Sequence, residues 1–349
     1  MYLFKKLSDY PPITGNKVPF VEKGWLDFLV ALKGIKPVYL EISSKEGDVV
    51  AFFVGGIFYF LGIKVLGSPF WGWMGQHMGF IIIRDVDKSN LVDDLIDYAS
   101  TKLNVKYFQM CCFIIDYSDI KECKHKLYIG EQYTTCYIDL TKDEGQLSKN
   151  LKSGYRTSIR KFAKDGGFIE EDYSDEFIEE HHKQLKQVFA KVGHKTPNYR
   201  AKMHKLFTSS DFSKAADDKL GVYSIKAMLP VEKDGHMENK NIASSYYIHN
   251  GYMAMFASNA SYGEYLRSCP NQALTWQAMM AFKAAGLHYL DMGGSGAYKL
   301  NYSGGAWQPK PIIIFCQSWF IRFIFLGLKR GYGKLSHFIG RIINVFKWS

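Results

Sequence analysis

Acidic residues are missing from the last part of this 349-residue chain. No Asp or Glu follows Asp291, although the same stretch contains eight cations, the first at Lys299 and the last at Lys347. The formal net charge of +10 is therefore concentrated toward the C-terminal end, and the rest of the chain is nearly balanced. A DNA-wrapping protein would carry its positive charge on a folded face. A basic terminal segment instead favours contact with an anionic surface.

Four further absences narrow the class of protein. The six cysteines form no CxxC pair and several lie in apolar runs, which predicts reduced, mostly buried thiols in a cytosolic protein. The apolar run 49–63, which contains no charged residue, has about 15 residues, whereas a membrane-spanning helix needs roughly 20. The first residues lack signal-peptide architecture. No histidine lies at metal-ligand spacing, so no metal is predicted, and the adjacent His181 and His182 are expected at the surface.

Hydrophobic periodicity predicts a mixed α/β (α+β) chain whose two halves share one order of elements: helix, strands, helix, strand. The expected first-half elements are a helix at 24–32, strands at 38–42, 80–83 and 105–115, a hairpin of 49–54 and 57–66 across Gly55-Gly56, and a helix at 90–103 capped by Ser89. The expected second-half elements are strands at 133–140, 168–173, 221–229, 242–249 and 251–256, and helices at 145–164, 177–192, 198–207 and 271–285. We expect two domains, 1–128 and 129–317, followed by a basic amphipathic tail, 318–349.

The stretch from His288 to Trp307 is the most informative part of the sequence. A short apolar strand ends at Asp291, and glycines at 293, 294 and 296 then allow a sharp turn or a close approach to a ligand. Lys299 follows, between two tyrosines. The pattern is typical of a binding site, although a tight turn between two core elements would give the same letters.

Three segments carry a family resemblance: 151–161 (LKSGYRTSIRK), 270–277 (PNQALTWQ) and 289–304 (YLDMGGSGAYKLNYSG). They resemble, in turn, the basic RNxIRKAxKxG helix, the PNxLLxWEAI helix start and the YDFGG stretch followed by FKxxFGG of the FemAB and CelD/BioF2-like group of GNAT-type acyltransferases. Thr157 stands where asparagine is usual in that group. The three segments occur in the family's order over residues 130–316. The first half is similar to the family's first domain more weakly. The resemblance implies tandem GNAT-like domains, each a mixed sheet flanked by helices.

The resemblance also implies an N-acyltransferase that acts on an amine of a cell-envelope precursor, such as an amino sugar, a lipid-linked sugar or a peptidoglycan stem. Acyl-CoA is the favoured donor. Aminoacyl-tRNA stays open as the alternative, because residues 267–272 stand where GNAT enzymes usually have a Gly-rich loop. The catalytic candidates are Lys299 as an oxyanion or phosphate ligand, Asp291 as the base for the amine, and Tyr265 as a proton donor. The donor or substrate candidates are Arg156, Arg160, Tyr246, Ser258, Asn259, Asn271, Gln272, Trp276, Gly293, Gly294 and Tyr302, with the phosphate at the start of the Asn271 helix.

Three other functions can be weighed against this one. Residues 293–297 nearly match the hydrolase motif GxSxG around Ser295, but no acid follows Asp291, which excludes a triad in that chain order. The basic helix at 149–164 would suit RNA. A GNAT-fold binding protein without catalysis would keep the same core.

The tail carries a prediction of its own. Residues 319–328 are almost wholly apolar, and 335–347 alternate an apolar stripe with a basic face. Such a segment is typical of a helix lying in the plane of an anionic membrane. We therefore expect a cytoplasmic protein that is peripheral at the inner membrane face through 319–349, with packing of the tail on the body or on a partner chain as the alternative.

Overall fold

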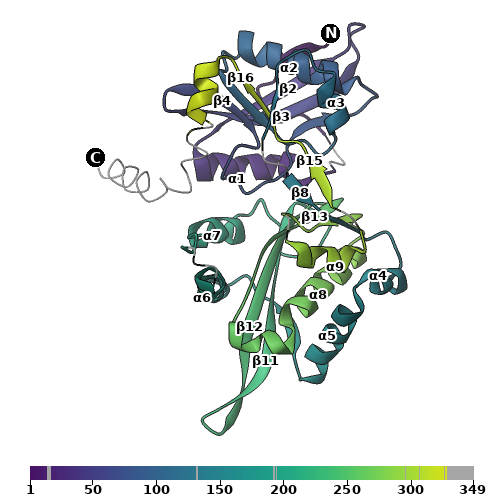
Figure 1. Ribbon diagram of the computed structural model, residues 1–349, viewed down its shortest axis with the longest axis vertical. Helices are drawn as coiled ribbons and strands as arrows, with labels where there is room; N and C mark the ends of the chain where they lie inside the picture. Colours follow the sequence, from purple (N-terminus) through teal and green to yellow (C-terminus); the bar gives the residue numbers. More distant parts are fainter. Residues whose placement is uncertain are drawn as a thin grey trace, which may run out of the picture.

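The structure is a computed structural model that describes residues 1–13, 17–130, 133–191, 193, 195–294, 296–305, 307–325 and 327. Two mixed sheets with flanking helices are stacked along the long axis of the molecule (Figure 1). The predicted α+β class is confirmed. None of the helices in the described ranges combines the length and the apolar character that crossing a bilayer would require.

The first sheet has the order β1-β2-β3-β4-β6-β16-β7, and β5 pairs with β3. Its strands are β1 (Leu3–Lys6), β2 (Lys36–Ser43), β3 (Val49–Phe60), β4 (Ile63–Ser68), β5 (Gly79–Ile82), β6 (Tyr107–Met110), β7 (Tyr128–Ile129) and β16 (Ile313–Cys316). Helix α2 (Lys88–Thr101), with α3 (Tyr117–Lys121) beside it, packs on one face. Helix α1 (Lys23–Lys33), which follows the 3₁₀ turn η1 (Pro19–Val21), packs on the other face.

The second sheet has the order β10-β11-β12-β13-β14-β9. Its strands are β9 (Tyr137–Asp139), β10 (Phe168–Glu171), β11 (Gly221–Lys233), β12 (His236–His249), β13 (Met253–Ser261) and β14 (Tyr289–Asp291). One face is covered by α4 (Glu144–Asn150), α5 (Ser153–Lys164), α8 (Pro270–Ala284) and α9 (Leu300–Ser303), and the other by α6 (Asp175–Lys191) and α7 (Arg200–Thr208). The 3₁₀ turns η2 (Gly263–Ser268) and η3 (Ala297–Lys299) precede α8 and α9, and β8 (Tyr133–Thr135) pairs with β15 (Gln308–Lys310) in a small third sheet.

The two halves contain the same βαβ unit. Strand β4 leads through α2 to the parallel strand β6, and β13 leads through α8 to the parallel strand β14. The strand beside each unit comes from another part of the chain: β16 pairs with β6, and β9 pairs with β14. Strand β16 lies within 129–317, the range expected for the second half, yet it belongs to the first sheet.

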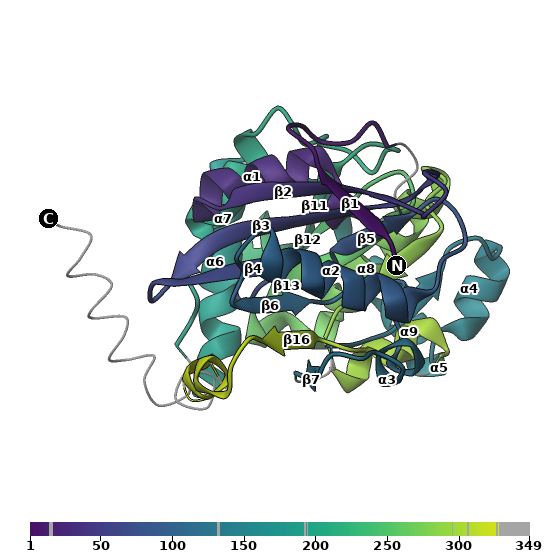
Figure 2. The same cartoon turned by 90° about the horizontal axis from the view of Figure 1, so that it is seen from above.

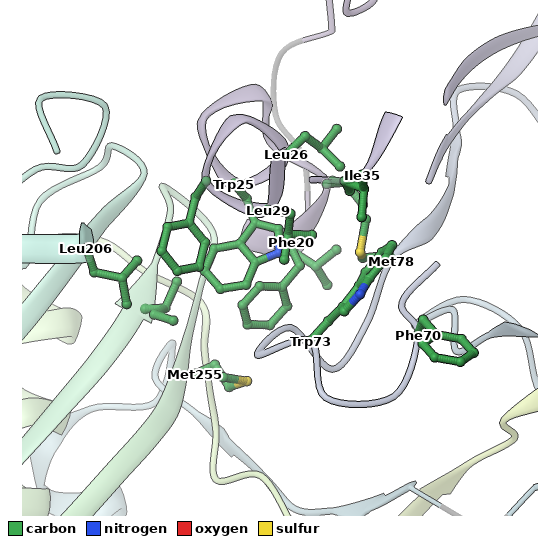
Figure 3. Packing of buried hydrophobic residues seen from close by; sticks show 14 of the residues in the cluster. Phe20, Trp25, Leu26, Leu29, Ile35, Phe70, Trp73, Met78, Leu206 and Met255 are labelled. Atoms are coloured by element: carbon green, nitrogen blue, oxygen red, sulfur yellow. The ribbon is translucent and has the colours of Figure 1, made fainter. Parts of the chain in front are cut away.

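A single apolar cluster joins the two halves. The rings of Trp25 and Phe28 on α1 meet Phe212 of the second half edge to face, with centroids 6.4 and 6.0 Å apart. Figure 3 shows Leu206 and Met255 of the second half facing the side chains of α1 across this contact. Lys205 also donates to the carbonyl of Ala31 at 2.6 Å. The halves therefore share a core.

The predicted hairpin across Gly55-Gly56 is wrong. Strand β3 runs straight through both glycines to Phe60, and the turn lies at Leu61-Gly62, where φ is 50° and 76°. The glycines are needed for close packing, because a Cβ at Gly56 would lie 2.5 Å from the Ile35 side chain. Glycine inside a strand often marks such an approach.

Three other predicted elements differ from the structure. The polar loop expected between 229 and 242 is instead the end of a long hairpin, which turns at Asp234-Gly235. The basic helix expected at 145–164 is broken into α4 and α5, because the amide of Lys152 donates to the carbonyl of Asn301. Helix α2 is capped by Asp87, which accepts from the Asn90 amide at 3.0 Å, rather than by Ser89.

The expected surface position of the two adjacent histidines is also wrong. Both are buried on α6. The ring of His181 bridges two hydroxyls, with Nδ1 2.7 Å from Ser244 and Nε2 2.9 Å from Ser258. Burial lowers the pKa of His181 to about 3, so its ring is neutral at ordinary pH.

Candidate active site

The second sheet opens between β13 and β14. The parallel pairing ends where Met255 faces Asp291, but β13 continues to Ser261. A register shift opposite Tyr246 and Tyr247 makes Ala257 an extra residue on β13, a β-bulge. A cavity of about 430 Å³ lies beside the continuing part of β13, lined by Tyr155, Val188, Lys191, Phe256, Asn259, Ala260, Ser261, Leu266, Asn271, Gln272, Thr275, Tyr298 and Tyr302.

The N-terminus of α8 forms one wall of this cavity. Pro270 occupies the first turn, and no side chain caps the helix. The preceding residue, Cys269, has a left-handed backbone with φ of 59°. The first amides of a 15-residue helix thus keep their hydrogen-bonding capacity, and the helix dipole adds partial positive charge. Such a terminus suits a phosphate or another anion.

Two buried amide groups at the cavity lack partners. Asn259 Nδ2 and Asn271 Oδ1 are inaccessible to solvent and make no hydrogen bond within the described residues. The other side-chain atom of Asn271, Nδ2, donates to Ser261 Oγ at 3.1 Å. Since buried polar atoms are nearly always paired, one donor and one acceptor here are positioned for a polar ligand.

Three tyrosines form the opposite wall. The rings of Tyr155 and Tyr302 meet with centroids 4.8 Å apart, and the Tyr302 hydroxyl donates to the carbonyl of Asn271 at 3.4 Å. The Tyr155 hydroxyl donates to the carbonyl of Tyr298 at 3.3 Å. Desolvation by its neighbours raises the pKa of Tyr298 to about 12, although the residue is 48% exposed, so its hydroxyl keeps its proton at neutral pH. Helix α5 and the segment after β14 are thereby fastened to α8.

Lys299 lies directly behind the cavity wall. Its Nζ donates to the carbonyl of Gly293 and lies 5.0 Å from the ring centroid of Phe256, which lines the cavity. Desolvation lowers the pKa of this half-buried ammonium, although the nearby Asp291 opposes the change. The turn that carries the lysine needs left-handed backbone, with φ of 57° at Gly293 and 64° at Gly294.

Asp291 is placed to hold this turn and does not line the cavity. Its carboxylate is buried and accepts from Thr135 Oγ1 and, at 2.8 Å, from the Gly293 amide. The ring of His77, in the first half, lies 3.5 Å away and also contacts the Tyr137 hydroxyl at 3.2 Å. The Asp291–His77 contact thus links the lysine turn to the other half of the molecule.

The structure brings five of the residues predicted from the sequence around the opening: Asn259, Asn271, Gln272 and Tyr302 line the cavity, and Lys299 lies behind it. Trp276 is half-buried on α8, outside the cavity lining. Ser258 and Tyr246 lie at the other face of the sheet, against His181.

Three more of the predicted residues lie outside the cavity lining. The Tyr265 hydroxyl contacts the Lys240 ammonium at 3.2 Å. Arg156 donates to the carbonyls that end α4, including that of Leu151 at 2.6 Å, and Arg160 is exposed. The Arg156 guanidinium is therefore occupied by backbone carbonyls, and neither arginine is among the described residues that line the cavity. Ser295 lies outside the described residues.

Sequence reasoning missed several residues of the site. Tyr155, Tyr298 and Thr275 line the cavity but were not singled out, although Tyr155 and Tyr298 lie inside the basic and lysine motifs. His77 is buried against Asp291 from a loop some two hundred residues earlier. The first two could have been found from their motifs, whereas nothing in the letters pairs His77 with Asp291.

Comparison with known proteins identifies the fold. No protein-family model matches the chain, and no curated protein matches it in sequence. The structure is similar to the crystal structure of FemX, with a TM-score of 0.64 and 11% identity over 85% of this chain and 92% of FemX. It is also similar to L-PGS from Bacillus licheniformis, with a TM-score of 0.48 and 12% identity over 87% of this chain and 96% of that chain. The predicted resemblance to the FemAB-like GNAT-type fold is thus confirmed at the level of fold.

Proposed function

We propose that the protein is an N-acyltransferase that binds an activated, phosphate-bearing acyl donor in the cavity at the start of α8. The unpartnered amide atoms of Asn259 and Asn271 carry this proposal, because they are buried at the uncapped end of a helix. The similarity of the fold to FemX, together with the cavity beside β13 of this chain, supports it.

The transfer would proceed in one addition and one elimination. The nitrogen of the acceptor attacks the acyl carbon, a C–N bond forms, and the carbonyl oxygen becomes an oxyanion. The positive charge of the Lys299 ammonium, on the far side of Phe256, stabilises this oxyanion through its electric field. The bond to the leaving sulfur or oxygen then breaks. The protonated Tyr298 hydroxyl gives its proton to the leaving atom and later takes another proton from solvent. The attacking nitrogen releases its extra proton to solvent. The amine attacks in its neutral form, because only an unprotonated nitrogen has the lone pair that forms the new bond.

An acyl-CoA is the donor that the cavity favours. The pyrophosphate would meet the first amides of α8, and the acyl carbonyl would lie toward Phe256 and Lys299. An amine of an envelope precursor remains the proposed acceptor, as the sequence resemblance implies.

One observation favours aminoacyl-tRNA as the second candidate donor. The exposed cations Lys152, Arg160, Lys161 and Lys164 lie on α5, the helix that also contributes Tyr155 to the cavity. A nucleic-acid backbone could follow that face to the cavity. Binding of this donor should then weaken steeply with salt, whereas acyl-CoA binding should depend on salt much less.

Calorimetric titration of the full chain with acetyl-CoA and with aminoacyl-tRNA tests the proposal. We expect acetyl-CoA to bind, and Asn271→Ala to weaken binding roughly three- to tenfold, as expected for one lost hydrogen bond. Asn239→Ala, at an exposed position of the β11–β12 hairpin, is the matched control and should bind as the wild type does. If neither donor binds, or if both variants behave like the wild type, the cavity is not the donor site.

A further inference from the structure

The first half carries an exposed aromatic patch far from the cavity. Five large apolar side chains are mostly exposed at one end of the strands of the first sheet, beside the turn between β3 and β4. They are Tyr59 (69%), Leu61 (70%), Trp319 (77%), Phe320 (56%) and Phe323 (69%). We call these five residues the edge patch. Two of them lie at the turn between β3 and β4, and three lie on the helical residues 319–325. Contiguous apolar surface of this kind marks an interaction site.

The two parts of the edge patch are held together by buried aromatics. Phe325 stacks on Tyr107 with centroids 3.8 Å apart, and it also contacts Phe60 beside the turn, at 5.5 Å. The guanidinium of Arg322 lies 3.8 Å from the ring centroid of Tyr128. Figure 2 shows the turn of β3 and β4 beside the yellow helix that follows β16. The patch is therefore a fixed surface of the fold.

Helical geometry separates the inward and outward side chains of 319–325. Phe325 and Arg322, three residues apart, pack on the first sheet. Trp319, Phe320 and Phe323 occupy positions i, i+1 and i+4, which share the opposite side of a helix. The three aromatic side chains consequently point away from the sheet, next to the exposed turn.

The charge around the edge patch has one sign. The described segments that build this edge, 49–84, 98–115 and 313–325, contain no Asp or Glu. Lys64 lies on β4 and Lys106 lies just before β6, and the Lys106 amide donates to the Lys64 carbonyl. A patch of Trp, Tyr and Phe with only cations in its segments complements an interface of apolar chains and anionic headgroups.

We propose that the edge patch docks the protein on an anionic membrane surface, with the β3–β4 turn and the helical residues 319–325 entering the headgroup region together. The prediction from the sequence concerned 319–349, most of which lies outside the described residues. The new element is the turn at Leu61, which no amphipathic pattern in the tail indicates. The proposal does not depend on the proposed acyl transfer.

Vesicle co-sedimentation of the full chain tests this inference. We expect binding to phosphatidylcholine vesicles that contain phosphatidylglycerol, weaker binding at high salt, and little binding to phosphatidylcholine alone. Tyr59→Ser/Leu61→Ser and Trp319→Ser/Phe323→Ser should each weaken binding about tenfold, since apolar area leaves the membrane. Met237→Ser is the matched control, because Met237 is 67% exposed at the tip of the β11–β12 hairpin, at the opposite end of the molecule (Figure 1).

Three results would overturn the inference. Equal binding by the wild type and by both patch variants would show that the edge patch does not contact lipid. Absence of vesicle binding by the wild type would show the same. Loss of self-association in the Trp319→Ser/Phe323→Ser variant, measured by analytical ultracentrifugation and without any vesicle binding, would make the patch a subunit interface.

Discussion

The ammonium of Lys299 provides the sharpest test at the scale of single residues. Desolvation lowers its pKa, so this lysine loses its charge at a lower pH than an exposed lysine does. If the charge stabilises the oxyanion, kcat for acyl transfer should fall as pH rises through that lowered pKa. Lys299→Arg should remove this alkaline decline because arginine stays charged. Lys299→Ala should lower kcat roughly 100-fold at neutral pH.

The pH–rate profiles of the wild type and the two variants decide the role of Lys299. Lys283, on α8, is the control position, because its ammonium donates to the carbonyl of Leu140 outside the cavity. Lys283→Arg should leave the alkaline decline in place. A decline that persists unchanged in Lys299→Arg would assign it to another group, such as Tyr298.

At the scale of single elements, the start of α8 should respond to one charge in two opposite ways. Gln272 is the third residue of the helix and lines the cavity. Gln272→Glu should stabilise the protein by about 0.3–1 kcal/mol, since a carboxylate favours a helix N-terminus. The same charge should weaken binding of a phosphate-bearing donor severalfold. Thermal denaturation and donor titration measure the two effects.

The opposite effects of Gln272→Glu on stability and on donor binding test the anion site. Gln277→Glu, at an exposed position further along α8 and outside the cavity lining, is the matched control and should leave donor binding unchanged. A Gln272→Glu variant that is stabilised but binds the donor as before would place the phosphate elsewhere.

Elements built by local periodicity could be predicted, and those set by distant contacts could not. The apolar spacing of α1, α2, α6 and α8 gave these helices to within a few residues. Gly55-Gly56 looked like a turn because the close contact of Gly56 with Ile35 is not visible in the letters. The break before α5 depends on the amide of Lys152 reaching Asn301, far along the chain. Periodicity reports which face is buried, but not which partner a backbone group finds.

The residues of the candidate site also fall into those that local sequence predicts and those that distant contacts determine. Asn271 could be predicted from its helix-start motif and Lys299 from its glycine turn. The environment of Asp291 could not be predicted, because Thr135 and His77 approach it from other strands and loops. As a result, a carboxylate that looked like a base in the sequence is a buried support of the lysine turn.

At the scale of the whole molecule, strand exchange and a shared core tie the halves together. Strand β16 completes the first sheet after the chain has built the second, and β9 enters the second sheet before it. The Trp25, Phe28 and Phe212 rings and the Asp291–His77 contact close the interface. Two halves joined in this way should unfold as one cooperative unit.

Phe212→Ala should therefore destabilise both halves at once. Phe212 is almost fully buried against α1, and removal of such a ring costs about 3–5 kcal/mol. In native-state hydrogen exchange, amides of β2 and β3 in the first sheet should lose as much protection as those of β12 and β13 in the second. Phe168→Ala, on the exposed edge strand β10, is the control and should change stability by less than about 0.5 kcal/mol. Loss of protection confined to the second sheet would mean that the halves fold independently, and the Asp291–His77 contact would then be a contact between two separate domains.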